Sequence, residues 1–473
     1  MRDNINWIEK KFSYKALDKE PWIKGMKKRP LKSGDHIVVV GGGIAGSAFV
    51  RRLLFLCAKE KKAVKITLVN STSCNYCGGL ITDLALNTFK NVYELDVPEG
   101  VVLTRIKGFS YVNSRGSFDI RINIPLIGML RTSRFGVLGF DESLKKRILE
   151  GLPSEIAEYL TVIEPTIVTH ITPQEPGNKP WKITLSRRIE GEKIELTADF
   201  MVLAGGLKMV ETPLLKEFAE FTGYQAPPLM PASVTEIDTS KAKVNITNDK
   251  LYVLDNIITG AVIGLVSKGE NWLTLTSLGK ELNKEDLDYL FSHPEVKKHL
   301  DLPYISKYLR CGIVCRARVY TGPAKNFYGD NWAAIGDLNG YGRVLKDGYQ
   351  ASLLSAKLVA DNIVYTGTDK QSLHRNYFLH VDRLRLDNKI GMLLFSANNK
   401  LSQSKIFNRY FVKSAQIEIG KNEYGGSVHS AIRALMTGEL PYKWIAFLFF
   451  TGLFRRLLTP WQFWLIHKGC KRF

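Results

Sequence analysis

The stretch HIVVVGGGIAGSAFVRRLL, residues 36–54, constrains the fold more than any other part of the chain. Its valine-rich start is apolar on both faces, which is typical of a buried strand in a parallel sheet. Three glycines then form a bare turn, and a helix is expected from about Ala45. A second strand, VKITLVN, ends at Asn70. The order strand, turn, helix, strand predicts an α/β lobe with a parallel sheet.

The glycines of this turn fit the pattern G-x-G-x-x-G at Gly41, Gly43 and Gly46. The first makes a tight turn, the second lets the backbone approach a pyrophosphate, and the third lets the helix pack closely on the strand. Unpaired N–H groups at the helix start, around Ile44 and Ala45, favour phosphate. Asn70 stands about where a ribose-binding acid is expected, and its amide accepts a hydrogen bond without a charge. The unit predicts a dinucleotide site.

Two later segments favour FAD over NAD. The stretch LTADFMVLAGG, residues 196–206, is a strand with a small-residue end that includes Ala204 and Gly205. The stretch NWAAIGDLNGYGRVLKDGYQAS, residues 331–352, contains a strand ending at Gly336-Asp337, then a glycine-rich turn and a helix. An aspartate at a strand end can hold a ribityl hydroxyl, and the next helix start faces the phosphate and flavin end. Further candidate contacts in this turn are Lys346 and Gly348.

These three pieces, in this order, resemble the FAD-dependent oxidoreductases of the p-hydroxybenzoate hydroxylase (PHBH) superfamily, with the geranylgeranyl reductase and FixC-like group as the nearest branch. The resemblance covers roughly residues 36–365. It implies an α/β fold with an FAD-binding Rossmann-like lobe of the glutathione reductase/PHBH type, an inserted antiparallel β substrate domain and a C-terminal helical region. It places the glycine turn and Asn70 at the ADP half of FAD, and Asp337 at the junction of ribityl chain and phosphate.

The segment RTSRFGVLGFDESLKKRI resembles, with looser spacing, the R-x-x-F-D-x-x-L stretch of that superfamily. The resemblance makes Arg131 or Arg134 a candidate nucleotide contact. The alternative is a surface arginine beside a helix.

A cysteine pair follows the second strand directly, with Cys74 and Cys77 in STSCNYCGGLITD. The segment Cys77-Gly78-Gly79 resembles a Cys-Gly stretch that lies near the isoalloxazine in geranylgeranyl reductase-like proteins, which makes it the candidate catalytic segment. A second pair, Cys311 and Cys315, precedes the Gly336-Asp337 motif. Three interpretations stay open: packing thiols, a redox-active thiol or dithiol, and a metal or iron–sulfur site. No metal ligands are assigned.

Between residues 207 and 327 the pattern changes to alternating strands joined by polar turns, where the superfamily inserts a sheet over the flavin. The superfamily's aromatic Y-x-W-x-F-P stretch is replaced here by TGAVIGLV, residues 259–266. An aliphatic wall suits an apolar substrate, and ordinary sheet core is the alternative. Because no second G-x-G-x-x-G appears, the reductant stays open among NAD(P)H, ferredoxin, an electron-transfer flavoprotein and quinol.

The C-terminal region is basic and apolar. The run WIAFLFFTGLF, residues 444–454, is flanked by lysine and arginine, and it is too short to cross a bilayer as a helix, which takes about 20 residues. Aromatic rings and cations at its edges favour an interfacial segment; a buried helix and a protein-partner interface are the alternatives. The chain carries 66 Lys and Arg against 46 acids, which favours an anionic partner such as a membrane surface. No basic run interleaved with aromatics indicates nucleic acid.

We therefore expect a basic extension at 1–35, an FAD-binding domain at 36–206 and 328–365, a substrate domain at 207–327 and a membrane-facing helical region at 366–473. No signal peptide is evident, and six cysteines indicate a reducing compartment. The expected location is cytoplasmic, peripheral on the inner face of the cytoplasmic membrane. The expected function is an FAD-dependent oxidoreductase for a lipid-like or isoprenoid substrate. Alternatives are a flavin monooxygenase, a quinone-linked electron-transfer flavoprotein, or a flavin subunit of a membrane complex with a redox partner protein.

Overall fold

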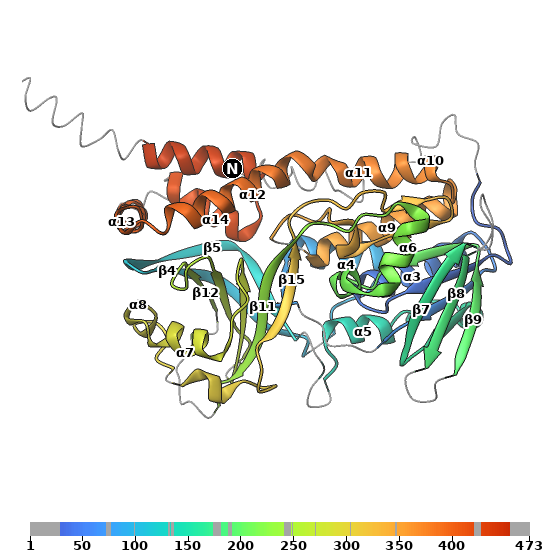
Figure 1. Ribbon diagram of the computed structural model, residues 1–473, viewed down its shortest axis with the longest axis horizontal. Coiled ribbons are helices and arrows are strands. Elements are labelled where there is room, and N and C mark those ends of the chain that lie inside the picture. Colours follow the sequence, from blue (N-terminus) through green and yellow to red (C-terminus); the bar gives the residue numbers. More distant parts are fainter. Residues whose placement is uncertain are drawn as a thin grey trace, which may run out of the picture.

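The computed structural model describes most of the chain. The described residues are 29–71, 77–98, 100–130, 133, 137–173, 181–187, 192–240, 247, 249–269, 271–302, 304–345, 348–420 and 427–454. Figure 1 shows two sheet regions side by side, with a layer of helices along one side of both.

The first sheet has six strands in the order β16-β17-β10-β1-β2-β6, and all but the edge strand β16 run parallel. Its centre is buried on both faces, as the valine-rich stretch predicts: Val38 and Val39 are fully buried. The strands are β1 (His36–Val40), β2 (Lys65–Val69), β6 (Leu160–Ile163), β10 (Phe200–Leu203), β16 (Tyr328–Gly329) and β17 (Trp332–Ala334).

Helices and a small sheet surround these strands in the described part of the chain. The three-stranded sheet contacts β1 and β2 through its outer strands β9 and β7. An aromatic cluster joins it to the first sheet, because the Phe218 ring lies 5.5 Å from Trp181 and 4.8 Å from Trp332, centroid to centroid. The elements are α3 (Ile44–Lys59), α4 (Asp83–Tyr93), α5 (Phe140–Lys146), α6 (Pro213–Thr222), β7 (Thr166–Pro173), β8 (Trp181–Arg187) and β9 (Lys193–Ala198).

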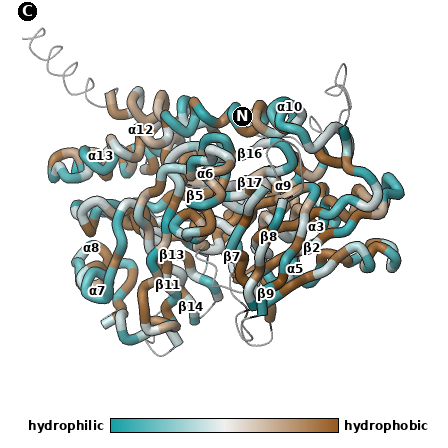
Figure 2. The backbone as a smooth tube through the Cα atoms, turned by 45° about the vertical axis from the view of Figure 1, so that its right-hand side comes forward, coloured by the Kyte–Doolittle hydropathy of each residue, from teal (hydrophilic) through white to brown (hydrophobic). Residues whose placement is uncertain are grey.

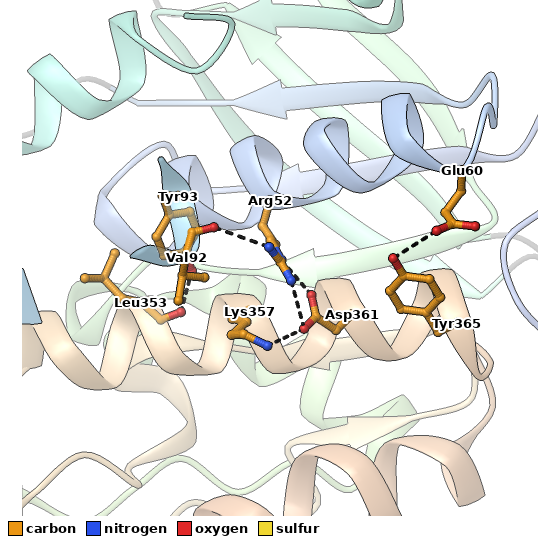
Figure 3. A network of polar contacts seen from close by, with 8 residues as sticks. All are labelled: Arg52, Glu60, Val92, Tyr93, Leu353, Lys357, Asp361 and Tyr365. Atoms are coloured by element: carbon orange, nitrogen blue, oxygen red, sulfur yellow. Dashed lines mark hydrogen bonds and ion pairs between the residues drawn. The ribbon is translucent and has the colours of Figure 1, made fainter. Parts of the chain in front are cut away.

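A largely buried ion pair joins α3, the helix that follows the glycine turn, to α9 (Gly348–Tyr365). In Figure 3, Asp361 on α9 accepts hydrogen bonds from Arg52 on α3 at 2.7 Å and from Lys357 at 2.5 Å. Burial opposes ionisation of this carboxyl, but the two cations outweigh it and lower the pKa of Asp361. The pair holds together two segments separated by some three hundred residues in the chain.

The second sheet has eight strands in the order β15-β11-β14-β13-β12-β4-β5-β3, antiparallel except where β12 pairs with β4. It contains the strands expected between 207 and 327, and it also contains three strands from residues 80–129. One face packs on α7 (Lys284–Ser292) and α8 (Pro294–Lys297). The strands are β3 (Leu80–Thr82), β4 (Val102–Asn113), β5 (Gly116–Met129), β11 (Leu229–Asp238), β12 (Lys250–Asp255), β13 (Val262–Ser267), β14 (Trp272–Leu278) and β15 (Cys315–Tyr320).

The described residues from 370 to 454 are mostly helical, which confirms the expected C-terminal helical region. Helices α13 and α14 pack on β5, and their side chains Phe411, Val412 and Ile432 share one core with the sheet. Among the described helices, none combines the length and apolar character that crossing a bilayer requires. The helices are α10 (Lys370–Leu373), α11 (Leu379–Val381), α12 (Arg385–Leu401), α13 (Lys405–Gly420) and α14 (Ser427–Thr437), followed by helical residues 442–454.

Candidate functional site

A cavity of about 970 Å³ lies where the two sheets and the C-terminal helices meet. Its polar end is walled by the glycine turn and the ends of the parallel strands, and its apolar end by the second sheet and the C-terminal helices. Most of the candidate residues line it: Gly41, Gly43, Ile44, Ala45, Asn70, Cys77, Gly78, Ala204, Gly205, Asp337 and Gly348. The sequence motifs thus come together in one site.

The glycine turn is packed so tightly that side chains are excluded. Gly41 has a φ of +115°, and a Cβ there would lie 2.5 Å from the carbonyl oxygen of Ala204. A Cβ on Gly46 would lie 1.8 Å from the carbonyl oxygen of Gly41. The first glycine therefore permits the turn, and the third lets α3 sit directly against β1.

The middle glycine faces open space instead. A Cβ on Gly43 would meet no atom within 4 Å. Gly43 is also the N-cap of α3, with no side-chain cap and no acid in the first turn. The first N–H groups of a helix carry a partial positive charge that attracts an anion. The turn therefore offers room and uncapped donors to a pyrophosphate.

The amide at the end of β2 is held by two neighbours. The Asn70 Oδ1 accepts a hydrogen bond from the Gly42 N–H at 3.3 Å, and its Nδ2 donates to Glu164 at 2.9 Å. Lys145 donates to the same Glu164 carboxylate at 2.6 Å. Burial opposes ionisation, but these two donors outweigh it and lower the pKa of Glu164. The end of β2 has no carboxylate of its own, but Glu164, which follows the neighbouring strand β6, lies beside Asn70. The sequence analysis missed Glu164 because it follows a different strand.

The Gly336-Asp337 corner comes after β17 and faces the start of α9. Gly336 has a φ of +65°, and a Cβ there would lie 2.8 Å from the Ala45 side chain. Burial raises the pKa of Asp337 to about 6, so this carboxyl is enclosed without a compensating cation. A ligand hydroxyl that donates a hydrogen bond to it would relieve that burial cost. Gly348, the first residue of α9, lies beside the carboxyl.

The segment Cys77-Gly78-Gly79 lies against the second sheet. A Cβ on Gly78 would lie 2.7 Å from Thr276 Cγ2, and the buried Lys268 donates to the Gly78 carbonyl at 2.8 Å. Burial raises the pKa of the Cys77 thiol, although the Gly79 N–H, 3.4 Å from Sγ, acts in the other direction. A thiol that stays protonated is a weak nucleophile. This geometry favours packing beside the cavity over redox exchange.

The second cysteine pair lies away from the cavity. Cys311 is exposed and Cys315 lies on β15 within a small separate core, and neither lines the cavity. Within the described ranges, no group of three or more metal-ligating side chains occurs. Four residues of the sequence prediction, Cys74, Arg131, Arg134 and Lys346, lie outside the described residues.

The apolar end is formed by alternate residues of the second sheet, such as Leu251 and Val253 on β12. A polar cluster interrupts it. The buried Asp255 accepts hydrogen bonds from Tyr111 and, at 2.9 Å, from Asn398 on α12. Burial raises the pKa of Asp255 despite these donors. No sequence pattern predicts this cluster, because Tyr111, Asp255 and Asn398 come from three distant segments.

The lining residues fit an extended FAD. Uncapped helix N–H groups stand beside open space at Gly43. The Asn70 amide at the end of β2 lines the cavity and donates to Glu164, which does not line it. The Asp337 carboxyl also lines the cavity. Glycines at these positions leave the backbone accessible to the phosphates. The cavity continues from there past Gly78 to the second sheet.

No protein-family model matches the chain, and no curated protein matches it in sequence. Solved structures do match. A geranylgeranyl bacteriochlorophyll reductase-like protein from Thermoplasma acidophilum aligns with a TM-score of 0.58 at 16% identity, covering 81% of this chain and 91% of that one. A flavoprotein/dehydrogenase from Cytophaga hutchinsonii gives 0.54 at 13%, covering 77% and 86%. The flavin-dependent brominase Bmp2 gives 0.52 at 15%, covering 90% and 99%.

These likenesses extend over most of each chain, and they agree with the site geometry. They confirm the fold class expected from the glycine turn and the Gly336-Asp337 motif. The chain has the fold of the FAD-dependent oxidoreductases of the PHBH type.

Proposed function

We propose that the protein is an FAD-dependent oxidoreductase that acts on a largely apolar, lipid-like or isoprenoid substrate at a membrane surface. The observation that carries the proposal is the single cavity with two unlike ends. One end offers glycine backbone and helix N–H groups, and the other offers aliphatic side chains.

The residues around the cavity have distinct roles in this proposal. The backbone around Gly41 and Gly43 holds the pyrophosphate, Asn70 with Glu164 faces the ribose, and Asp337 accepts from a ribityl hydroxyl. Cys77-Gly78-Gly79 and Lys268 fix the wall beside the ring system. When bound, FAD supplies hydride or single-electron transfer at its isoalloxazine, while the protein positions the substrate and excludes water.

The walls of the apolar end support the proposed substrate class. Leucine, valine, isoleucine and phenylalanine side chains from β12, β13 and the C-terminal helices form most of them. Burying a hydrocarbon chain there gains about 25 cal/mol for each Å² removed from water. The likeness to a reductase-like protein of geranylgeranyl type agrees with such a substrate.

A flavin monooxygenase is the second candidate, because the brominase Bmp2 aligns over 90% of this chain with a TM-score above 0.5. The two candidates differ in what consumes the reducing equivalents. Oxygen uptake coupled to NAD(P)H oxidation indicates the monooxygenase. Reduction of a quinone analogue or a polyprenyl double bond without oxygen uptake indicates the dehydrogenase or reductase.

The first test is an absorption spectrum of the purified protein, followed by identification of the chromophore released on denaturation. We expect bound FAD. Anaerobic titration with NADH, NADPH, reduced ferredoxin, an electron-transfer flavoprotein and a quinol then identifies the donor. Protein that is colourless, and stays so after incubation with FAD, contradicts the proposal.

A further inference from the structure

The exposed apolar side chains of the described residues gather at one end of the chain. Most of them lie between Leu379 and Phe454, on the helical layer of Figure 1. Single exposed apolar residues are ordinary, but a group on adjacent helices marks a contact surface. We call six of them the C-terminal apolar surface: Leu386, Leu393, Trp444, Phe447, Phe450 and Phe454.

The helix of residues 442–454 is apolar on both faces, and it is largely brown in Figure 2. Its inner face packs into the protein, with Ile445 only 3% exposed. Its outer face carries Trp444, Phe447, Phe450 and Phe454, each more than half exposed. Their spacing of three or four residues places them on one stripe. A helix of this kind needs a second apolar environment outside the protein.

Helix α12 lies beside this helix, because Tyr442 packs against Gly391, and Ile445 and Leu394 belong to one hydrophobic core. Its outer stripe alternates apolar and basic residues. Leu386 and Leu393 are each 70% exposed, and the exposed Lys389 and Lys400 lie on the same stripe. Residues seven apart return to one face after two turns.

The exposed charged side chains described around this surface are all positive. From residue 375 to 454, no acidic side chain of the described part of the chain falls in the exposed class. The exposed cations there are Arg375, Arg383, Arg385, Lys389, Lys400, Lys405, Arg409, Lys413 and Lys443. Cations around an apolar centre match an anionic lipid headgroup layer over its hydrocarbon.

The cavity reaches this surface. Leu401 and Leu435 are each 38% exposed and Phe450 is 51% exposed, yet all three also line the cavity. Side chains that line the cavity and remain accessible to solvent mark where the cavity opens, and we call this opening the mouth. The mouth is therefore apolar, and Phe450 joins it to the C-terminal apolar surface.

We propose that the C-terminal apolar surface inserts into the interface of an anionic phospholipid bilayer, and that the mouth at Leu401, Leu435 and Phe450 admits substrate directly from the lipid. The proposal rests on the proposed function and deepens it, because it names the surface that meets the membrane and the path of the substrate. A hydrocarbon substrate then passes from bilayer to cavity without crossing water, which avoids the cost of exposing its apolar area.

The arrangement favours lipid over a protein partner. A protein interface of this charge would need matching acids on the partner and would close over the mouth. A bilayer satisfies the cations and the exposed phenylalanines together and supplies apolar molecules at the mouth.

The docking is tested with the full-length, FAD-loaded protein and sedimented vesicles. We expect binding to vesicles of phosphatidylcholine and phosphatidylglycerol, and weaker binding to phosphatidylcholine alone. Phe447→Ser with Phe450→Ser lowers the affinity for the mixed vesicles about 100-fold, since each side chain loses its burial in the interface. The matched control is Phe221→Ser, because Phe221 is also 51% exposed but lies on α6; it changes the affinity less than about twofold.

Equal affinity for both vesicle types and all variants overturns the docking. So does a loss of binding that Phe221→Ser shares, and so does recovery of the protein only in a complex with another protein. Circular dichroism and bound-flavin absorbance of each variant show that it is folded.

The mouth is tested by light-activated cross-linking with a phospholipid that carries a diazirine on its acyl chain. We expect adducts on Leu401, Leu435 or Phe450 and on the inner Phe449. Adducts confined to Trp444 and Phe447 overturn entry while leaving docking intact. Because neither assay needs turnover, failure of the proposed function shows separately, as protein without bound FAD.

Discussion

The two ends of the cavity are built by opposite means. At the polar end, glycines remove side chains so that backbone can meet backbone: Gly41 and Gly46 each leave no room for a Cβ. At the apolar end, large side chains from the sheet and from four C-terminal helices of the described residues form the walls. The polar end therefore tolerates almost no change, whereas the apolar end can accept other apolar side chains of similar volume.

The largest effects are expected at two glycines near the same turn, where alanine should affect stability at one position and FAD binding alone at the other. Gly46→Ala places a methyl group 1.8 Å from the Gly41 carbonyl oxygen, so both the folded state and FAD binding are lost. Gly43→Ala meets no protein atom within 4 Å, so the apoprotein keeps its melting temperature but binds FAD at least about 100-fold more weakly. Calorimetry and flavin titration measure both.

The Gly43→Ala variant can also contradict the assignment of the polar end. If Gly43→Ala binds FAD like the unchanged protein, the space beside Gly43 is not the pyrophosphate site, and the polar end has been assigned wrongly.

The next effect contrasts two buried aspartates. Asp361 is paired with Arg52 and Lys357, whereas Asp255 has neutral donors only. Asp361→Asn leaves two cations without their partner, so we expect a loss of about 3 kcal/mol in unfolding free energy at pH 7. Asp255→Asn costs about 1 kcal/mol or less, because a neutral amide carries no charge to bury.

The ion pair of Asp361 also predicts how the unfolding free energy changes with pH. The pKa of Asp361 is lowered in the folded state, so its stabilisation is complete above the unfolded pKa of about 3.9 and is lost as pH falls through the folded pKa. The difference between Asp361→Asn and the unchanged protein in urea unfolding should therefore shrink in acid. A difference independent of pH contradicts the ion pair.

A smaller effect concerns Asp337, whose pKa burial raises to about 6. A ribityl hydroxyl donates to the carboxylate form, so FAD binding should tighten as pH rises through 6. Between pH 5 and pH 7 the dissociation constant should fall about tenfold. Asp337→Asn weakens binding and removes this pH dependence. Titration by flavin fluorescence measures it, and a variant that keeps the full pH dependence shows that another group titrates.

The smallest effect is expected at Cys77. Its thiol is buried and protonated, so Cys77→Ala should change the rate of flavin reduction by less than about twofold and cost about 1 kcal/mol of stability. Stopped-flow absorbance at the flavin maximum is the measurement. A large fall in that rate, with the spectrum intact, would restore the redox interpretation.

The sequence motifs of the polar end line one cavity, and their signals are local. Gly41, Gly43 and Gly46 act within one turn, and the Gly336-Asp337 corner follows its own strand. Glu164 reaches Asn70 from another strand, and Asn398 reaches Asp255 across 143 residues. Such contacts depend on the tertiary arrangement, which no local pattern encodes. The strands of residues 80–129 are a similar case, because their membership in the second sheet depends on pairing with β12.

That pairing has a consequence for synthesis. Leu254 on β12 sits opposite Val112 on β4, so the parallel edge of β4 stays unpaired until more than a hundred further residues have left the ribosome. Non-local pairing of this kind slows folding and leaves a strand edge open to other chains. We therefore expect the nascent polypeptide to be most prone to aggregation during this interval.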